Sequence, residues 1–205
     1  MAVAALVLYL TGLGLAFGWR SVAQRRRTGD TGLRLHAGPV GSVAWWAKMS
    51  FVAALLLGAA APIAALAGLP LAAVFDRPVS RWLGVLIAVA GVLGVLWCQS
   101  GMGASWRVGV DPAERTALVT TGPFAVVRNP IFTAMIATSA GLALMVPTVV
   151  AFAALVLLIA SVELQVRAIE EPYLRRVHGS VYTAYTAEVG RFLPRIGRAS
   201  AGTTP

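Results

Sequence analysis

The amino-acid sequence predicts an all-α, polytopic integral membrane protein. Of its 205 residues, 58% are hydrophobic and only 12% are charged, and the mean hydropathy is +0.78, values that are atypical of a water-soluble domain. Apolar runs of roughly 20 residues recur along the chain, and each must form a helix that satisfies its own backbone inside the hydrocarbon core. We therefore expect about five transmembrane helices in one membrane domain.

Five apolar segments are candidates for these spans, at about residues 2–19, 43–69, 82–98, 131–146 and 148–166. Only Pro147 separates the last two, which favours a tight helical hairpin over one unbroken helix of twice the required length. No basic region precedes the first segment, so we expect it to be retained as a span and not removed as a signal peptide.

The placement of charge orients these spans. The net charge is +9, but the basic residues lie between apolar runs and not on an aromatic-bearing soluble surface, so no nucleic-acid partner is expected. A basic loop after the first span should be cytoplasmic, with the N-terminus outside and the C-terminus inside. Only Arg77 and Arg81 of the 17 basic residues then lie outside, as expected for a bacterial inner membrane protein. The loop residues are Arg20, Arg25, Arg26, Arg27 and Arg34.

Metal and disulfide chemistry are not expected. Cys98 is the single cysteine, and with only His36 and His178 available it cannot build a thiolate metal cluster. We expect Cys98 to be a packed thiol.

Two polar segments should meet at the cytoplasmic interface, because a hairpin brings its open ends together. One enters the fourth span and the other leaves the fifth. The first holds Gly122-Pro123-Phe124, Arg128-Asn129-Pro130 and Phe132; the second holds Glu163, Glu170-Glu171, Gly179, Tyr182, Tyr185 and Arg191. The sequence therefore predicts one site built from two distant segments.

The residue types leave two interpretations open for each charged group. Arg128 suits a carboxylate or phosphate, or is a snorkelling interfacial arginine. Glu170 and Glu171 suit hydroxyls, an ammonium or a sulfonium group, or pair with Arg167 and Arg175 on a solvated helix.

The aromatic and glycine-rich segments also allow two interpretations each. Tyr182 and Tyr185 either stack on a flat ring or belong to an interfacial aromatic belt. Glu163, inside the fifth span, requires a partner or water. The loop from Gly101 to Arg107 is either a lid or a plain interfacial loop.

With these motifs in place, the chain resembles the isoprenylcysteine carboxyl methyltransferase family, within the wider group of integral membrane methyltransferases that includes phospholipid methyltransferases. The resemblance covers about residues 101–194. The matching residues are Gly122, Pro123, Phe124, Arg128, Pro130, Glu170, Glu171, Leu174, Gly179, Tyr182, Tyr185, Arg191 and Pro194. Asn129 stands where that family usually has His, Phe132 where it has Tyr, and Glu188 where the eukaryotic enzymes have Arg.

The resemblance implies an S-adenosyl-L-methionine-dependent methyltransferase whose lipophilic acceptor enters from the bilayer. That acceptor would be a prenylated or lipid molecule, with the carboxylate of an isoprenylcysteine-like compound as the first candidate. It implies catalytic roles for Arg128, Glu171 and Arg191. The implied cofactor-binding residues are Gly122, Pro123, Phe124, Asn129, Pro130, Phe132, Glu170, Glu171, Tyr182 and Tyr185.

Two rival functions are carried forward. Sterol and steroid reductases resemble this family in their C-terminal halves, so an NADPH-dependent membrane reductase is one, and a non-catalytic family member is the other. In either case we expect three N-terminal spans in residues 1–100, a methyltransferase-like region in 101–198 and a disordered tail in 199–205.

Overall fold

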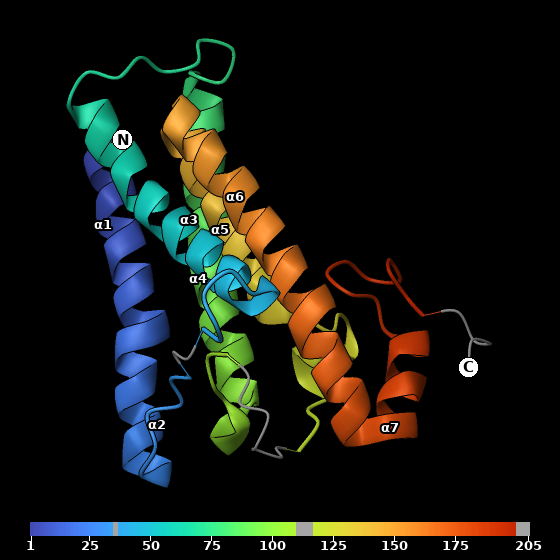
Figure 1. Ribbon diagram of the computed structural model, residues 1–205. Coiled ribbons are helices and arrows are strands. Elements are labelled where there is room, and N and C mark those ends of the chain that lie inside the picture. Colours follow the sequence, from blue (N-terminus) through green and yellow to red (C-terminus); the bar gives the residue numbers. More distant parts are fainter. Residues whose placement is uncertain (35–36, 110–116, 200–205) are drawn as a thin grey trace.

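The computed structural model describes residues 1–34, 37–109 and 117–199, and these form an all-helical bundle (Figure 1). Within these ranges, β pairing is limited to two isolated bridges. The helices are α1 (Ala2–Leu13), α2 (Arg20–Thr28), α3 (Val43–Leu66), α4 (Pro78–Gly101), α5 (Pro130–Met145), α6 (Val149–Gln165) and α7 (Glu171–Glu188). The π-helical turns η1 (Gly14–Trp19) and η4 (Val166–Glu170) join α1 to α2 and α6 to α7, and the 3₁₀ turns η2 (Gly103–Ser105) and η3 (Gly122–Ala125) lie between α4 and α5.

Four helical stretches of the described chain are long and apolar enough to cross a membrane: Ala2–Thr28, Val43–Leu66, Pro78–Gly101 and Val149–Glu188, and in the last of these α6 is the apolar part. The predicted fourth span is the shorter apolar helix α5, whose 16 residues rise roughly 24 Å. As expected, α5 and α6 form a hairpin around Pro147, and Thr148 begins α6 by accepting a hydrogen bond from the Ala151 N–H.

Two sequence-based boundaries were wrong. The residues from Arg20 to Arg27 are not a loop, because the first helix continues through η1 and α2 as far as Thr28. No glycine or proline interrupts this basic stretch until Gly29, whose φ of 78° ends the helix. The third apolar helix begins at Pro78 instead of about residue 82, since proline is well suited to the first turn.

Small residues allow α4 and α5 to approach closely. Gly84, Ala88 and Gly91 face Thr138 and Gly141 across the contact, and Ala88 is fully buried. A Cβ atom added at Gly84 would lie 2.6 Å from the Gly141 carbonyl oxygen. Without a hydrophobic driving force between helices in lipid, this close packing is a main source of their association.

A methyl group at this contact should therefore destabilise the bundle. We expect Gly141→Ala to lower the free energy of unfolding by about 1–3 kcal/mol, because its Cβ would overlap the Ala88 backbone nitrogen. Thermal unfolding in detergent would measure the effect. Gly14→Ala is the matched control, since nothing lies within 4 Å of a Cβ there; equal unfolding temperatures for both variants would contradict this account of the packing.

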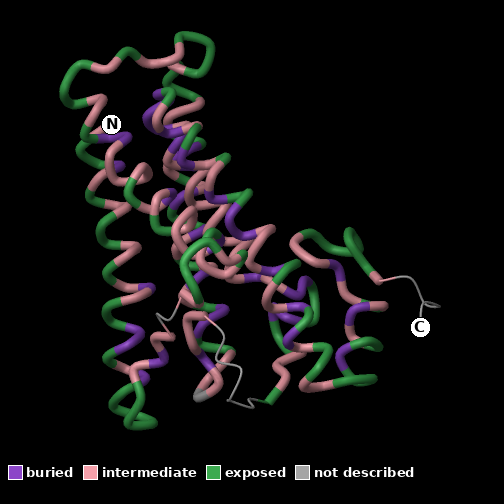
Figure 2. The backbone as a smooth tube through the Cα atoms, viewed as in Figure 1, coloured by how far each residue is buried: buried purple, intermediate pink, exposed green. Residues whose placement is uncertain are grey.

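The outer face of the bundle is apolar, as an integral membrane protein requires. Buried residues follow the inside of the bundle and the contacts of the C-terminal region (Figure 2). Exposed large apolar side chains lie on every long helix, including Val7, Leu10, Leu56, Leu86, Leu93, Trp97 and Val156. Such a surface is stable in a bilayer, where lipid tails cover it.

The polar end of the chain folds back on the bundle. Gly179 has φ 53° and ψ −126°, so it breaks α7 as predicted, and the chain after it turns back beside the first half of α7 (Figure 1). Ala199, the first residue of the predicted disordered tail, donates its N–H to the Thr186 carbonyl at 2.9 Å. The rest of that prediction, residues 200–205, lies outside the described residues.

Candidate active site

The two polar motifs meet through backbone hydrogen bonds. The N–H groups of Arg128 and Asn129 donate to the carbonyls of Gly190 and Arg191 at 2.8 and 3.0 Å. The Asn129 side chain donates to the same Arg191 carbonyl at 3.1 Å, and the Thr133 hydroxyl donates to the Phe192 carbonyl at 2.9 Å. The predicted convergence of the two segments is confirmed, and Asn129 contributes to it with its amide.

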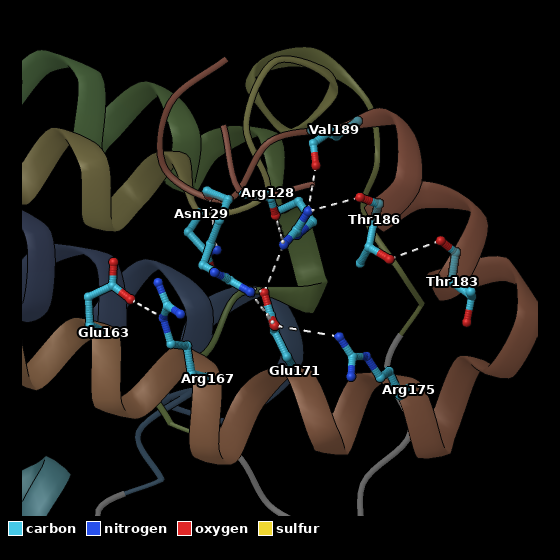
Figure 3. Close-up of polar contacts among 11 residues, drawn as sticks. Arg128, Asn129, Glu163, Arg167, Glu171, Arg175, Thr183, Thr186 and Val189 are labelled. Atoms are coloured by element: carbon cyan, nitrogen blue, oxygen red, sulfur yellow. Dashed lines mark hydrogen bonds and ion pairs between the residues drawn. The ribbon is translucent and has the colours of Figure 1, made fainter. Parts of the chain in front are cut away.

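Glu171 lies at the centre of a buried ion cluster (Figure 3). Arg128 Nη2 donates to Glu171 Oε1 at 2.9 Å, and Arg191 donates to both carboxylate oxygens at 2.7 and 3.0 Å. Arg175 adds a longer ion pair at 3.8 Å. Burial alone would raise the pKa of Glu171, but the hydrogen bonds from Arg191 and Arg128 outweigh it and hold this pKa below its usual value.

Arg128 also binds the C-terminal backbone. Its terminal nitrogens donate to the carbonyls of Thr186 at 3.2 Å and Gly197 at 3.1 Å, and to that of Val189. Arg128 is only 7% exposed. These contacts make Arg128 a clamp between the start of α5 and the segment after α7; its predicted role in orienting a ligand remains a prediction.

A cavity of about 240 Å³ lies beside this cluster. Among the predicted site residues, its lining includes Phe124, Arg128, Asn129, Pro130, Phe132, Glu170, Tyr182 and Tyr185. Gly122, Pro123, Glu171 and Arg191 are not part of that lining. The ion cluster therefore supports one wall of the cavity, while Glu170 and the aromatic residues face it.

The tyrosines form an aromatic wall of the cavity. Tyr182 is 2% exposed, and its ring centroid lies 6.2 Å from that of Tyr185. The Tyr185 hydroxyl donates to the Phe124 carbonyl at 2.6 Å, which ties α7 to the η3 turn. Burial raises the pKa of both phenols to about 12, so both are neutral at physiological pH.

Glu170 and Glu171 have different environments. Glu170 is half-buried, lines the cavity and accepts a hydrogen bond from Gln165 Nε2 at 3.2 Å. Burial raises its pKa to about 7, and the neighbouring Glu171 charge acts in the same direction. Arg167, one of the expected partners, pairs instead with Glu163, which supplies the partner that Glu163 required.

A second polar cluster, which sequence reasoning missed, supports another part of the cavity lining. The Arg20 guanidinium lies 4.9 Å from the Trp106 ring centroid and donates to the carbonyls of Gln99 at 3.2 Å and Gly103 at 2.9 Å. Gln99 Nε2 donates to the Ala16 carbonyl at 3.0 Å, within the π-helical η1. Placing Arg20 in a loop concealed this cluster; three polar residues at the end of an apolar helix, Arg20, Ser21 and Gln24, were the available signal.

The cluster connects the N-terminal helices to the cavity. Trp106 is 2% exposed and lines the cavity, as do Ala16, Phe17 and Gln99. Gln99 is 3% exposed, and no described residue hydrogen-bonds to its Oε1 atom. Gln99 therefore holds a buried, unsatisfied acceptor next to the cavity.

Comparison with known proteins agrees with this architecture. The comparison with curated proteins finds no match. A family model described as phospholipid methyltransferase matches residues 79–181, just over half of the chain. The match runs from the start of α4 to the middle of α7 and includes Arg128, Glu170 and Glu171, while Tyr182, Tyr185 and Arg191 follow it. The chain therefore belongs to the phospholipid methyltransferase family.

Proposed function

We propose that this membrane methyltransferase uses S-adenosylmethionine and transfers the methyl group to a lipophilic acceptor that enters from the bilayer. The observation that supports this most is the cavity itself, where a carboxylate and an aromatic wall from the C-terminal motifs face apolar residues of the N-terminal helices. A polar cofactor and an apolar acceptor would each find a matching side of it.

The lining residues fit the cofactor. Tyr182 and Tyr185 offer ring surfaces for a flat base, and Glu170 offers a carboxylate for a cation or hydroxyls. When bound, the cofactor would supply a methyl group on a positively charged sulfur. Arg128, Glu171 and Arg191 would keep the aromatic wall in place, because their contacts hold the two halves of the site together.

We further propose that the acceptor group is a carboxylate, as on an isoprenylcysteine-like or other isoprenoid acid. A carboxylate is already ionised at neutral pH, so the chain needs only to position it in line with the methyl group and exclude water. Phe124, Pro130 and Phe132 supply an apolar side that would exclude water from the reacting groups.

Ligand binding to purified protein in detergent, measured by calorimetry, tests the proposal. We expect saturable binding of S-adenosylmethionine and its demethylated product, and about a tenfold loss of affinity in Tyr182→Leu, which removes ring contact and the phenol. Phe152→Leu is the matched control, because Phe152 packs on Phe75 away from the cavity. Binding of NADPH alone would indicate a reductase, and binding of neither cofactor would indicate a non-catalytic protein.

A further inference from the structure

Three cavities lie in series through the helix bundle. The main cavity of about 240 Å³ shares Ala16, Phe17, Val95 and Met135 with a middle cavity of about 70 Å³. The middle cavity in turn shares Tyr9, Gly58, Ser139 and Leu142 with an end cavity of about 20 Å³. Because neighbouring cavities share wall residues, they lie next to one another between the polar site and the α5–α6 turn.

The walls of the middle cavity suit a hydrocarbon chain. They come from α1, η1, α3, α4, α5 and α6 and are almost wholly apolar. Thr138 is one of the few polar residues there, and its hydroxyl is satisfied by the Ala134 carbonyl at 2.9 Å. A hydrocarbon chain in this space would contact mainly apolar side chains, whereas a polar molecule would find few partners.

Glycines set the width of this space. Gly12 on α1 and Gly58 on α3 both line it, and neither adds a side chain. A Cβ atom at Gly12 would lie 3.1 Å from Val92, and one at Gly58 would lie 2.9 Å from the Tyr9 ring. With these close approaches and a volume of about 70 Å³, the space has room for one hydrocarbon chain at most.

Tyr9 closes the far end of the middle cavity. Its ring lies on the wall that the middle and end cavities share. Its hydroxyl donates to the Leu55 carbonyl at 2.6 Å, which fixes the ring between α1 and α3. A bound hydrocarbon chain that reaches the Tyr9 ring can extend no further without displacing that ring.

We propose that the middle cavity holds the single hydrocarbon chain of the methyl acceptor and that Tyr9 sets the longest chain the enzyme accepts. This inference rests on the proposed function, since it assumes that the reacting head group lies in the main cavity. It places a specificity determinant on α1, outside the part of the chain that the family match covers.

Photolabelling tests the proposal without requiring turnover. The probes are straight-chain primary alcohols from decanol to octadecanol, each carrying a diazirine at the chain end, and the labelled residues are mapped by mass spectrometry. In the wild type we expect the chain end to label Gly12, Leu13 and Gly58, with Ala61 and Ala143 of the end cavity unlabelled. Labelling confined to lipid-facing residues such as Val7 and Leu10 would overturn the proposal.

Substitutions at the end wall should move the label. Tyr9→Ala joins the middle and end cavities, so longer probes should label Ala61 and Ala143. Ser139→Leu fills the shared wall, so labelling should retreat toward Val95 and Ala16, and this variant keeps the test valid if Tyr9→Ala fails to fold. Leu10→Ala, a truncation to the same residue on the lipid-facing side of α1, should leave the labelling pattern unchanged.

The result separates the two proposals. If S-adenosylmethionine binds but Tyr9→Ala and Ser139→Leu label as the wild type does, the chain-length role of Tyr9 is wrong and the methyltransferase proposal stands. If labelling moves as expected but no S-adenosylmethionine binds, the middle cavity still holds a hydrocarbon chain and the proposed function is wrong.

Discussion

Replacing Glu171 with alanine should cost about 3–5 kcal/mol of the free energy of unfolding, the largest effect expected for a single substitution in this protein. The carboxylate is 4% exposed and accepts hydrogen bonds from both Arg128 and Arg191. Its removal leaves Arg128 buried without its counter-charge and frees the C-terminal segment that Arg191 holds. Unfolding in mixed micelles of increasing dodecyl sulfate content, measured without cofactor, would report this loss directly.

Glu163→Ala is the control for this prediction. Glu163 also pairs with an arginine, but the Arg167 side chain is 59% exposed, so losing that pair should change stability by less than about 1 kcal/mol. Because Arg191 is stranded in Glu171→Ala, the double variant Glu171→Ala/Arg191→Ala should lose less than the sum of the two single variants. Equal stability of Glu171→Ala and Glu163→Ala would show that the buried cluster does not hold the fold together.

The position of Glu171 shows where sequence reasoning stops. The pair Glu170-Glu171 was predicted to belong to the site, and the hairpin geometry correctly placed it beside Arg128. Nothing in the local sequence distinguishes the two carboxylates, because adjacent helical residues differ only in the direction of their side chains. The ion pair with Arg128 makes Glu171 an ionic anchor, while Glu170 lines the cavity.

The N-terminal half shows the same limit for a different reason. Its helices could be predicted, because apolar runs of spanning length have one stable form in a bilayer. The contribution of these helices to the cavity could not be predicted, because Gln99, Ala16 and Trp106 meet only through long-range packing. The expected loop at Arg20 was wrong because positive charge indicates which side of the membrane a segment occupies, and carries little information about whether the segment is helical.

Glu170 should make cofactor affinity depend on pH near neutrality. Its pKa is raised to about 7 by burial, so the carboxylate becomes charged as the pH rises through that value. If this carboxylate faces the positively charged sulfur, the affinity for S-adenosylmethionine should rise by up to about tenfold for each pH unit as the pH increases toward 7. Above pH 7 the affinity should reach a plateau. Calorimetric titrations at pH values from 5.5 to 8.5, limits that lie roughly one unit or more on either side of that pKa, would measure how the affinity changes with pH.

The stability of the cofactor-free protein should change in the opposite direction, decreasing as the pH rises. A carboxyl group whose pKa is raised on folding binds more protons in the folded state, so the free energy of unfolding falls as the pH rises between about 4.5 and about 7. Glu171, whose pKa is lowered, contributes stability that is present above its unfolded value and is lost only as the pH falls below it. Unfolding temperatures of the cofactor-free protein should therefore decrease over this window, and Glu170→Gln should remove most of the decrease.

Glu170→Gln also isolates the origin of the binding slope. The amide keeps the shape and the hydrogen bond to Gln165 within reach but cannot ionise, so affinity for S-adenosylmethionine should stay low and nearly independent of pH. The cofactor's own amino group titrates equally with both proteins and cancels in the comparison, and Tyr182 and Tyr185, with pKa values of about 12, do not titrate in this range. The demethylated product lacks the sulfonium charge, so its affinity for the wild type should depend less on pH. An identical pH dependence of S-adenosylmethionine affinity in the wild type and in Glu170→Gln would show that another group titrates and that Glu170 does not contact the sulfonium.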